Sequence, residues 1–267
     1  MHKNNPKLGF VRGDITNAKD VRKSIKDADA VIHEAAVTSV PLSIRRPDLV
    51  NKVNVEGTKM LLEESSRADV KRFIYASSCA VYGEVKKLPI REDEKTNPIS
   101  PYGKSKLEAE ALCKAFQEER GIETVCLRYF NVYGPRQTFG PYAGVILQFL
   151  ERVNNNKSPI IFGDGKQTRD FVHVSDIVQG SLLALESDKA AGQVINIGTG
   201  TETSIDQLCK IILKTLGRTD LKPIYMEPKP GDIRYSRADI TKAEKILDYH
   251  PKIGLEEGIK SLVRYQN

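Results

Sequence analysis

Residues 72–83 read Arg-Phe-Ile-Tyr-Ala-Ser-Ser-Cys-Ala-Val-Tyr-Gly, an apolar run that passes directly into small polar side chains. A short apolar run of this kind predicts a buried strand, and hydroxyl residues at its carboxyl end fall where parallel sheets bind ligands. Taken alone, the stretch is more typical of an ordinary polar strand exit. The sequence on either side decides between the two interpretations.

Strand-like runs and helical patterns alternate along the rest of the chain. We expect strands over residues 8–12, 30–35, 72–76, 124–129, 159–162 and 194–197. We expect helices over residues 20–26, 47–68, 101–120, 145–154, 174–185, 205–216 and 243–247. Ser100 is the expected N-cap of the third helix, with Pro101 in its first position. Repeated strand–helix units predict a parallel sheet covered on both faces, which is an α/β fold.

The composition is that of an ordinary globular protein, with 267 residues, 40% hydrophobic and 28% charged. The basic residues behind the net charge of +6 are dispersed among acids, which indicates a bias toward anionic ligands and no nucleic-acid partner. The four cysteines and four histidines show neither metal-ligand spacing nor a short disulfide pattern, which favours free thiols in the cytoplasm and no metal site. No apolar run is long enough to span a membrane.

A tyrosine and a lysine follow the opening stretch, at Tyr102 and Lys106. Residues four apart on a helix project from the same face. An ammonium held near a phenol favours the phenolate, so the tyrosine could act as a base nearer neutral pH. A hydroxyl from another element would complete a proton relay for an alcohol. Alone, this spacing is also that of an ordinary helix face.

The pair belongs to an ordered series of motifs. Two long ones are residues 127–136 (LRYFNVYGPR) and 162–176 (FGDGKQTRDFVHVSD), and shorter ones lie at residues 13–15, 31–36, 54–58, 196–198 and 230–232. With these motifs the chain resembles the extended short-chain dehydrogenase/reductases. Among them it is similar to the NAD-dependent epimerase/dehydratase family and to its UDP-glucose 4-epimerase group. The resemblance covers nearly the whole chain and is more specific for family than for substrate.

The resemblance implies a catalytic trio. Tyr102 would be the base on the sugar 4-hydroxyl, Lys106 would lower its pKa and hold the nicotinamide ribose, and Ser78 would share the proton transfer. Hydride would pass from sugar C4 to NAD, and would return to the other face of the 4-keto sugar. NAD is therefore the implied cofactor, and it is regenerated in each turnover.

The resemblance also implies binding residues. Those on the cofactor side are Asp14 and Ile15 at adenine, Ala35 and Ala36 along the backbone beside NAD, and Asn54, Tyr102, Lys106 and Tyr129. Those on the UDP-sugar side are Ser78, Asn131, Arg169 and Lys229 toward the sugar and diphosphate, Val145, Ile160 and Phe162 at uracil, Asp232 at ribose and Ser236 near the sugar 2-position. From the residues alone, a turn or cap role for Asp14 and a packing role for Asn54 are about as well supported.

Departures from the family pattern narrow the reaction. Related dehydratases and decarboxylases have an acid right after the hydroxyl residue, where this chain has Cys79 and Ala80. This favours epimerisation, because eliminating water needs an added acid and base. The small Ser236 predicts that an N-acetyl group on the sugar is tolerated. Lys229 stands where the family has arginine, and it keeps the charge without the forked contact.

No glycine-rich dinucleotide motif occurs in the sequence, although the family opens with one. Judged against the family, roughly fifty residues of a βαβ unit precede the equivalent of residue 1, including the cradle for the NAD pyrophosphate. We expect residues 30–35 to form an exposed sheet edge. Residues 8–12 should either pair directly with residues 31–33 or detach.

The sequence thus predicts an α/β protein with an amino-terminally truncated Rossmann-type parallel sheet and a small carboxyl-terminal substrate-binding subdomain. The dinucleotide-binding domain would comprise residues 1–136 and 170–200, and the nucleotide-sugar subdomain residues 137–169 and 201–267. The implied function is 4-epimerisation of a UDP-hexose by a cytoplasmic homodimer. Three alternatives stay open: a UDP-sugar-binding remnant without NAD, a chain that has lost the first segment of an active protein, and a nucleotide-sugar dehydratase or decarboxylase.

Overall fold

The main sheet of the protein is parallel throughout. The computed structural model describes residues 5–137, 144–228 and 231–266. Four strands pair in the order β1-β2-β3-β8. Their bounds are β1 (Ala30–His33), β2 (Arg72–Ser78), β3 (Glu123–Tyr129) and β8 (Val194–Ile197). The parallel sheet predicted from the strand–helix pattern is confirmed.

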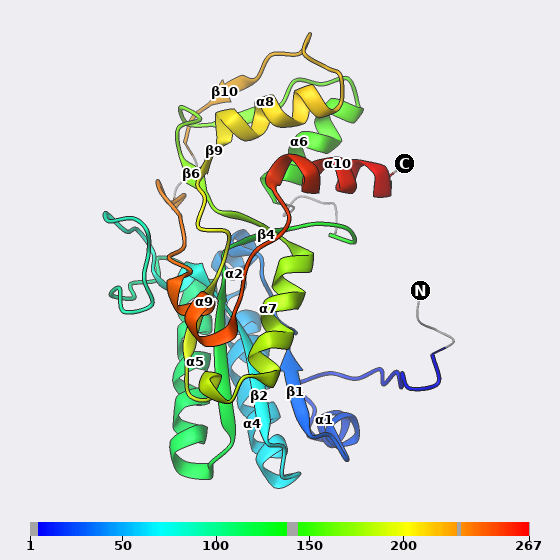
Figure 1. The fold of residues 1–267 in the computed structure, drawn as a ribbon, viewed down its shortest axis with the longest axis vertical. Coiled ribbons are helices and arrows are strands. Elements are labelled where there is room, and N and C mark those ends of the chain that lie inside the picture. Colours follow the sequence, from blue (N-terminus) through cyan, green and yellow to red (C-terminus); the bar gives the residue numbers. More distant parts are fainter. Residues whose placement is uncertain (1–4, 138–143, 229–230, 267) are drawn as a thin grey trace.

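Helices cover both faces of this sheet (Figure 1). One face packs against α1 (Ala18–Ile25), α4 (Gly57–Arg67) and α5 (Pro101–Arg120), and the other against α7 (Val174–Glu186) and α9 (Thr241–Leu247). Successive residues of β2 alternate between the two layers: Phe73 and Tyr75 face α4 and α5, whereas Ile74 and Ala76 face α7 and α9. Burial on both faces explains why this strand is apolar without alternation.

A second hydrophobic core lies beyond the carboxyl edge of the sheet, in the upper part of Figure 1. It contains the helices α6 (Val145–Asn154), α8 (Ile205–Thr215) and α10 (Leu255–Gln266). A parallel pair of strands, β5 (Ile160–Phe162) and β10 (Ile224–Met226), belongs to the same part. Apolar residues spaced along α6 and α8 face inward, as the helical patterns predicted.

Short strand pairs run between the two cores. β4 (Asn131–Tyr133) pairs with β7 (Phe171–His173), and β6 (Thr168–Arg169) pairs with β9 (Thr203–Ser204). The buried carboxylate of Asp170 lies between β6 and β7. It accepts hydrogen bonds from Thr199 N (2.8 Å), Thr199 Oγ1 (2.6 Å), Gly200 N (3.0 Å) and Ala238 N (3.1 Å). This one side chain therefore joins three separate stretches of the chain beside the sheet edge.

The predicted start and end of α5 are confirmed. Ser100 caps the helix by accepting a hydrogen bond from Gly103 N (3.1 Å), and Pro101 is its first residue. The helix ends at Gly121, whose φ of 72° is the left-handed conformation that favours glycine. These local signals fix the position of the face on which Tyr102 and Lys106 lie.

The stretch predicted as one helix over residues 47–68 is interrupted. It consists of α3 (Pro47–Val50), a π-helical segment η1 (Asn51–Glu56) and α4. A π-helical turn is rare inside a helix and occurs often at functional sites. Here it contains Asn54, which is buried. The hydrophobic spacing of the sequence gives no sign of this change in helical period.

The strand predicted over residues 8–12 was wrong. These residues form no described strand, and Phe10 is 89% exposed. Of the two expected outcomes, detachment is the observed one, and Figure 1 shows this blue segment running away from the sheet toward the amino terminus. β1 forms one edge of the main sheet as described, with β2 as its neighbour.

The structure adds elements that the sequence patterns did not indicate. Besides the short strands β4, β6, β7, β9 and β10, they include the helices α2 (Val40–Arg45) and α10 and the 3-10 turns η2 (Cys79–Val81) and η3 (Asp188–Ala190). The helical pattern of α10 is interrupted by Gly258, where a Cβ atom would approach the Tyr133 hydroxyl to 2.0 Å. Tertiary packing thus explains a glycine that, in the sequence, argues against a helix.

We expect Asp170→Asn to lower the free energy of unfolding by about 3 kcal/mol, because the new amide N–H group would face backbone N–H donors. Thermal or urea unfolding measures the change. Asp93→Asn is the matched control: this carboxylate is exposed, and its loss should change stability by less than about 0.5 kcal/mol. Equal stability of the two variants would contradict the role given to Asp170.

Candidate active site

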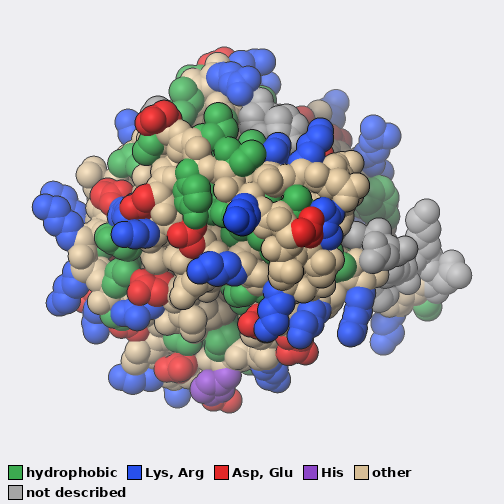
Figure 2. Space-filling model, turned by 90° about the horizontal axis from the view of Figure 1, so that it is seen from above, with side chains coloured by type: hydrophobic (Ala, Val, Ile, Leu, Met, Phe, Trp, Pro, Cys, Tyr) green, Lys and Arg blue, Asp and Glu red, His purple; other side chains and the backbone are tan. Residues whose placement is uncertain are grey.

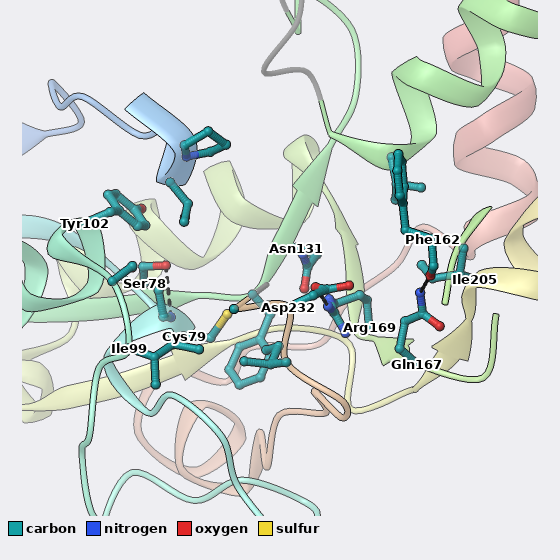
Figure 3. A pocket seen from close by; sticks show the side chains of 18 of the residues that line it. Ser78, Cys79, Ile99, Tyr102, Asn131, Phe162, Gln167, Arg169, Ile205 and Asp232 are labelled. Carbon is teal, nitrogen blue, oxygen red and sulfur yellow. Dashed lines mark hydrogen bonds and ion pairs between the residues drawn. The ribbon is translucent and has the colours of Figure 1, made fainter. Parts of the chain in front are cut away.

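A cavity of about 470 Å³ opens between the two cores at the carboxyl ends of β2 and β3. Figure 3 shows Ser78 and Tyr102 at one end, Arg169 and Asp232 near the middle, and Phe162 and Ile205 at the other end. Eight predicted residues line it: Ser78, Tyr102, Asn131, Val145, Ile160, Phe162, Arg169 and Asp232. The fold therefore brings together residues more than 150 positions apart in sequence.

Ser78 and Tyr102 reach the cavity from different elements. Ser78 is the last residue of β2, and its Oγ accepts a hydrogen bond from Ala80 N (3.2 Å). Tyr102 lies in the first turn of α5. Burial raises the pKa of Tyr102 to about 12, and hydrogen bonding with Ser78 opposes that shift. At neutral pH the Tyr102 phenol therefore holds its proton.

Lys106 is not among the residues that line the described cavity. Its Nζ donates a hydrogen bond to Ala76 O (2.6 Å) and sits 4.9 Å from the centre of the Tyr75 ring. Burial lowers the pKa of Lys106 to about 8, and the charge of Glu34 opposes this. The ammonium group is thus close to losing its proton near neutral pH. Its predicted effect on Tyr102 stays a prediction.

Asn54 connects the loop after β1 to α5. Its Oδ1 accepts a hydrogen bond from Val37 N (2.8 Å), and its Nδ2 donates to Val37 O (3.0 Å) and to Ser105 Oγ (3.0 Å). Ser105 lies between Tyr102 and Lys106 on α5. The side chain of Asn54 therefore holds two parts of the site together, which fits the packing role left open for it.

His33 supports the same region from beneath. Thr58 Oγ1 donates its proton to Asn54 O (2.6 Å), so the 2.9 Å contact between His33 Nε2 and Thr58 Oγ1 has the imidazole as donor. Burial lowers the pKa of His33 to about 3, so the ring is neutral. His33 is therefore a buried, neutral residue that packs and donates a hydrogen bond.

Except for Tyr102, the predicted cofactor residues are absent from the described cavity lining, and Ala35, Ala36 and Tyr129 lie at or just after the carboxyl ends of β1 and β3. Ala35 is exposed and Ala36 half-buried, which leaves their backbone open. Nearby, Tyr129 Oη donates to Glu34 Oε1 (2.8 Å) and lies 2.8 Å from Ser181 Oγ. Small residues beside an aromatic side chain fit the flat nicotinamide end of a dinucleotide. The sequence contains no glycine-rich loop that would fit its pyrophosphate.

Asp14 has local partners. Its Oδ1 accepts hydrogen bonds from Thr16 N (2.8 Å) and Thr16 Oγ1 (2.9 Å), and these bonds lower the pKa of the carboxyl group. The carboxylate thus stabilises its own turn, as the alternative interpretation held. Ile15 packs against α4 near Gly57. The adenine contacts assigned to both residues stay predictions.

The centre of the cavity is charged. Arg169 is buried, forms an ion pair with Asp232, and donates from Nη1 to Thr168 O (2.6 Å). Asn131, on β4, has a buried Oδ1 for which the described residues provide no partner. A guanidinium and an unsatisfied amide in one cavity are suited to a polar, anionic ligand.

The far end of the cavity is apolar. Val145, Ile160 and Phe162, which the resemblance places at uracil, line it together with Ile205 and Gln167. Gln167 Nε2 donates to Phe162 O (2.6 Å), which holds the turn between β5 and β6 (Figure 3). Gln167 was not among the predicted site residues, although it lies two residues before Arg169 in the 162–176 motif.

Two predicted substrate residues are not found in the described cavity lining, for different reasons. Ser236 is buried and is absent from the described cavity lining; it lies beside Cys79, which does line the cavity. Burial raises the pKa of the Cys79 thiol to about 11, so it stays protonated at neutral pH. Lys229 falls outside the described residues.

The remaining surface agrees with the dispersed charge of the sequence. Figure 2 shows basic side chains scattered among acidic ones on the face that it presents. Within residues 5–137, 144–228 and 231–266 we find no cluster of three or more metal-ligating side chains. In the same residues no helix has the length and apolarity needed to cross a bilayer.

Known proteins share this architecture. A putative UDP-glucose 4-epimerase of Methanocaldococcus jannaschii is 44% identical over 98% of this chain and 85% of the relative. The structure of UDP-glucose 4-epimerase from Thermotoga maritima with UDP-glucose matches with a TM-score of 0.93 and 41% identity, over 98% of this chain and 85% of that one. UDP-glucuronic acid 4-epimerase from Bacillus cereus, in complex with UDP-glucuronic acid and NAD, matches with a TM-score of 0.91 and 35% identity, over 98% and 82%.

The family assignment rests on both the sequence and the site. The model of the NAD dependent epimerase/dehydratase family matches residues 1–198, which include Ser78, Tyr102, Lys106 and the whole of the main sheet. The chain is also 44% identical to a relative over 98% of its own residues. It therefore belongs to the NAD dependent epimerase/dehydratase family.

Proposed function

We propose that this chain catalyses the NAD-dependent 4-epimerisation of a UDP-hexose, with UDP-glucose and UDP-galactose as the first pair to test. The observation behind this proposal is the order of groups along one cavity. A hydroxyl and a phenol lie at one end, a buried guanidinium lies near the middle, and an apolar slot lies at the other end. That order corresponds to a sugar, a diphosphate and a base.

Arg169 would bind the diphosphate, because a guanidinium can make forked contacts with phosphate oxygens. In the structure its charge is paired with Asp232. An entering diphosphate would take over the guanidinium and release the carboxylate to accept hydrogen bonds from the ribose. Phe162 and its apolar neighbours would hold the uracil. Asn131 Oδ1 would accept a hydrogen bond from the ligand.

Tyr102 and Ser78 would move the proton of the sugar 4-hydroxyl. Ser78 Oγ can relay a proton between the sugar and the phenol because hydroxyls both donate and accept. The phenol must lose its proton to act as base, and burial alone works against this. If the Lys106 ammonium turned from Ala76 O toward Tyr102, its charge would favour the phenolate. NAD, when bound, supplies the hydride acceptor and donor.

Dehydration is the less favoured reaction, because the cavity lacks an additional acid next to Ser78 among its described lining residues. Cys79 fills that place and remains a thiol at neutral pH. A second candidate function is UDP-sugar binding without NAD, because Ser78, Arg169 and Phe162 line the described cavity whereas Ala35, Ala36 and Tyr129 do not. NAD uptake by the purified protein separates the two: clear UDP binding with no uptake would favour the binding protein.

The N-acetylated sugars and the assembly are also proposals. Ser236 is small, and its position behind Cys79 would leave room only if Cys79 shifts, so UDP-GlcNAc and UDP-GalNAc are the second pair to assay. The resemblance supports a cytoplasmic homodimer that uses the helices over residues 47–68 and 101–120. It also supports a nucleotide-sugar subdomain of residues 137–169 and 201–267, which includes the second core.

We expect Tyr102→Phe to lower kcat for conversion of UDP-galactose to UDP-glucose by about 10²- to 10⁴-fold, because the base is lost. UDP-sugar affinity should stay within a few-fold, since Phe retains the ring. A coupled assay with added NAD measures the rate. Tyr265→Phe removes an exposed phenol on α10 and serves as control. A Tyr102→Phe enzyme with the wild-type rate would remove Tyr102 from the mechanism.

We expect Arg169→Lys to weaken UDP-glucose binding about tenfold, because the ammonium keeps the charge and loses the fork. Isothermal titration calorimetry measures this without turnover. Arg218→Lys is the matched control, since this arginine pairs with Asp220 away from the cavity lining. If both variants bind UDP-glucose like the wild type, the diphosphate does not lie at Arg169.

A further inference from the structure

A third ionisable residue continues the face of α5 that holds the proposed catalytic pair. Tyr102, Lys106 and Glu110 are spaced by four residues, so they lie one above another along the helix. Glu110 is buried, at 7% exposure. The mechanism above gives it no task, yet a buried carboxylate is costly unless specific partners hold it.

Glu110 has such partners on β2 and β3. Arg128 donates to it in a forked arrangement, from Nε to Oε1 (2.9 Å) and from Nη2 to Oε2 (2.7 Å). Ser77 Oγ donates to the same Oε1 through a short hydrogen bond. Arg128 is itself held over the Tyr82 ring, 4.7 Å from its centre. The carboxylate is therefore fixed in position by two neighbouring strands.

These contacts reach the last residues of β2 in succession. Lys106 binds the Ala76 carbonyl, Glu110 binds the Ser77 hydroxyl, and Ser78 lies in the cavity with Tyr102. Successive strand residues point to opposite faces. A fixed Ser77 therefore determines the direction in which Ser78 leaves the strand. The register of β2 with β3 places Ser77 directly opposite Arg128. The Glu110–Arg128 ion pair therefore also fixes the position of this end of β2 in the sheet.

Glu110 also lies one turn beyond Lys106 on the same face of α5, so its charge contributes to the surroundings of the Lys106 ammonium. The charged and titratable groups around Lys106 are Glu34 after β1, His33 on β1, Tyr75 on β2, and Cys113 and Glu110 on α5. His33 is neutral, and burial raises the pKa of Tyr75 well above its usual range. Glu34 and Glu110 are the two carboxylates in this group, and Glu110 is the buried one.

We propose that Glu110 is a positioning residue for the proposed epimerisation: through Ser77 it sets the orientation of Ser78, and through its charge it holds the Lys106 ammonium. It acts through these groups and does not touch the substrate. The inference rests on the proposed function for its effect on rate. A purely structural ion pair with Arg128 would stabilise the core and leave Ser78 and Lys106 unchanged.

Ser77→Ala tests the first link, because it removes the hydroxyl and leaves the Glu110–Arg128 pair intact. We expect kcat to fall about tenfold, with KM for UDP-galactose within about twofold, because a small displacement of a reacting group slows the reaction more than it weakens binding. Ser65→Ala is the matched control, since Ser65 is a buried serine on α4 whose Oγ has no partner among the described residues. An unchanged kcat in Ser77→Ala would overturn this link.

Glu110→Gln tests the second link without turnover. We expect the Lys106 titration midpoint, near pH 8 in the wild type, to fall, because the ammonium loses a neighbouring anion. ¹³C-lysine NMR follows the midpoint, and Lys106→Arg identifies the signal. Should Glu110→Gln fail to fold with Arg128 left unpaired, Glu110→Gln combined with Arg128→Leu removes the buried charge as well.

The two measurements separate the two proposals. If the wild-type chain with NAD turns over no UDP-hexose, the proposed function fails, and a lowered Lys106 midpoint in Glu110→Gln still supports the positioning role. A midpoint equal to that of the wild type overturns the role of Glu110, whether or not the chain is active.

Discussion

The site depends on the hydrogen bonds of the buried residue Asp170. Its carboxylate accepts hydrogen bonds from the turn after β8 and from Ala238 N, and its backbone carbonyl accepts one from the backbone N–H of Asn131 (2.9 Å). Arg169 is its immediate neighbour in sequence, so the guanidinium projects into the cavity from a point that the carboxylate fixes.

A second set of contacts fixes the chemical end of this cavity. α5 begins at a serine cap and continues with Tyr102, Lys106 and Glu110 on one face, and each of the last two binds a residue of the β2 exit. Asn54 adds a connection from the loop after β1 to the same turn of the helix. Along the cavity, Arg169 forms an ion pair with Asp232, and Tyr102 holds its proton at neutral pH.

Much of this could be predicted from the sequence, because the main signals are local. Ser100-Pro101 marks the start of α5, the apolar run before Ser77 marks β2, and the motif around Arg169 places a cation near a turn. The direction of the Lys106 ammonium, the burial of Ser236 and the π-helical segment could not be predicted. Each depends on packing between elements distant in sequence, which hydrophobic spacing does not record. Residues 8–12 have a strand-like pattern, yet no described strand lies beside them.

The π-helical segment between Asn51 and Glu56 has a consequence for the length of the chain at this point. Such a segment holds one residue more than the same stretch of α-helix, and it contains Asn54. Shortening the segment by one residue would restore an ordinary α-helix, in which the side chains of this stretch would point in other directions. The chain can therefore accept substitutions along η1 more readily than a deletion, since a deletion would turn Asn54 away from both Val37 and Ser105.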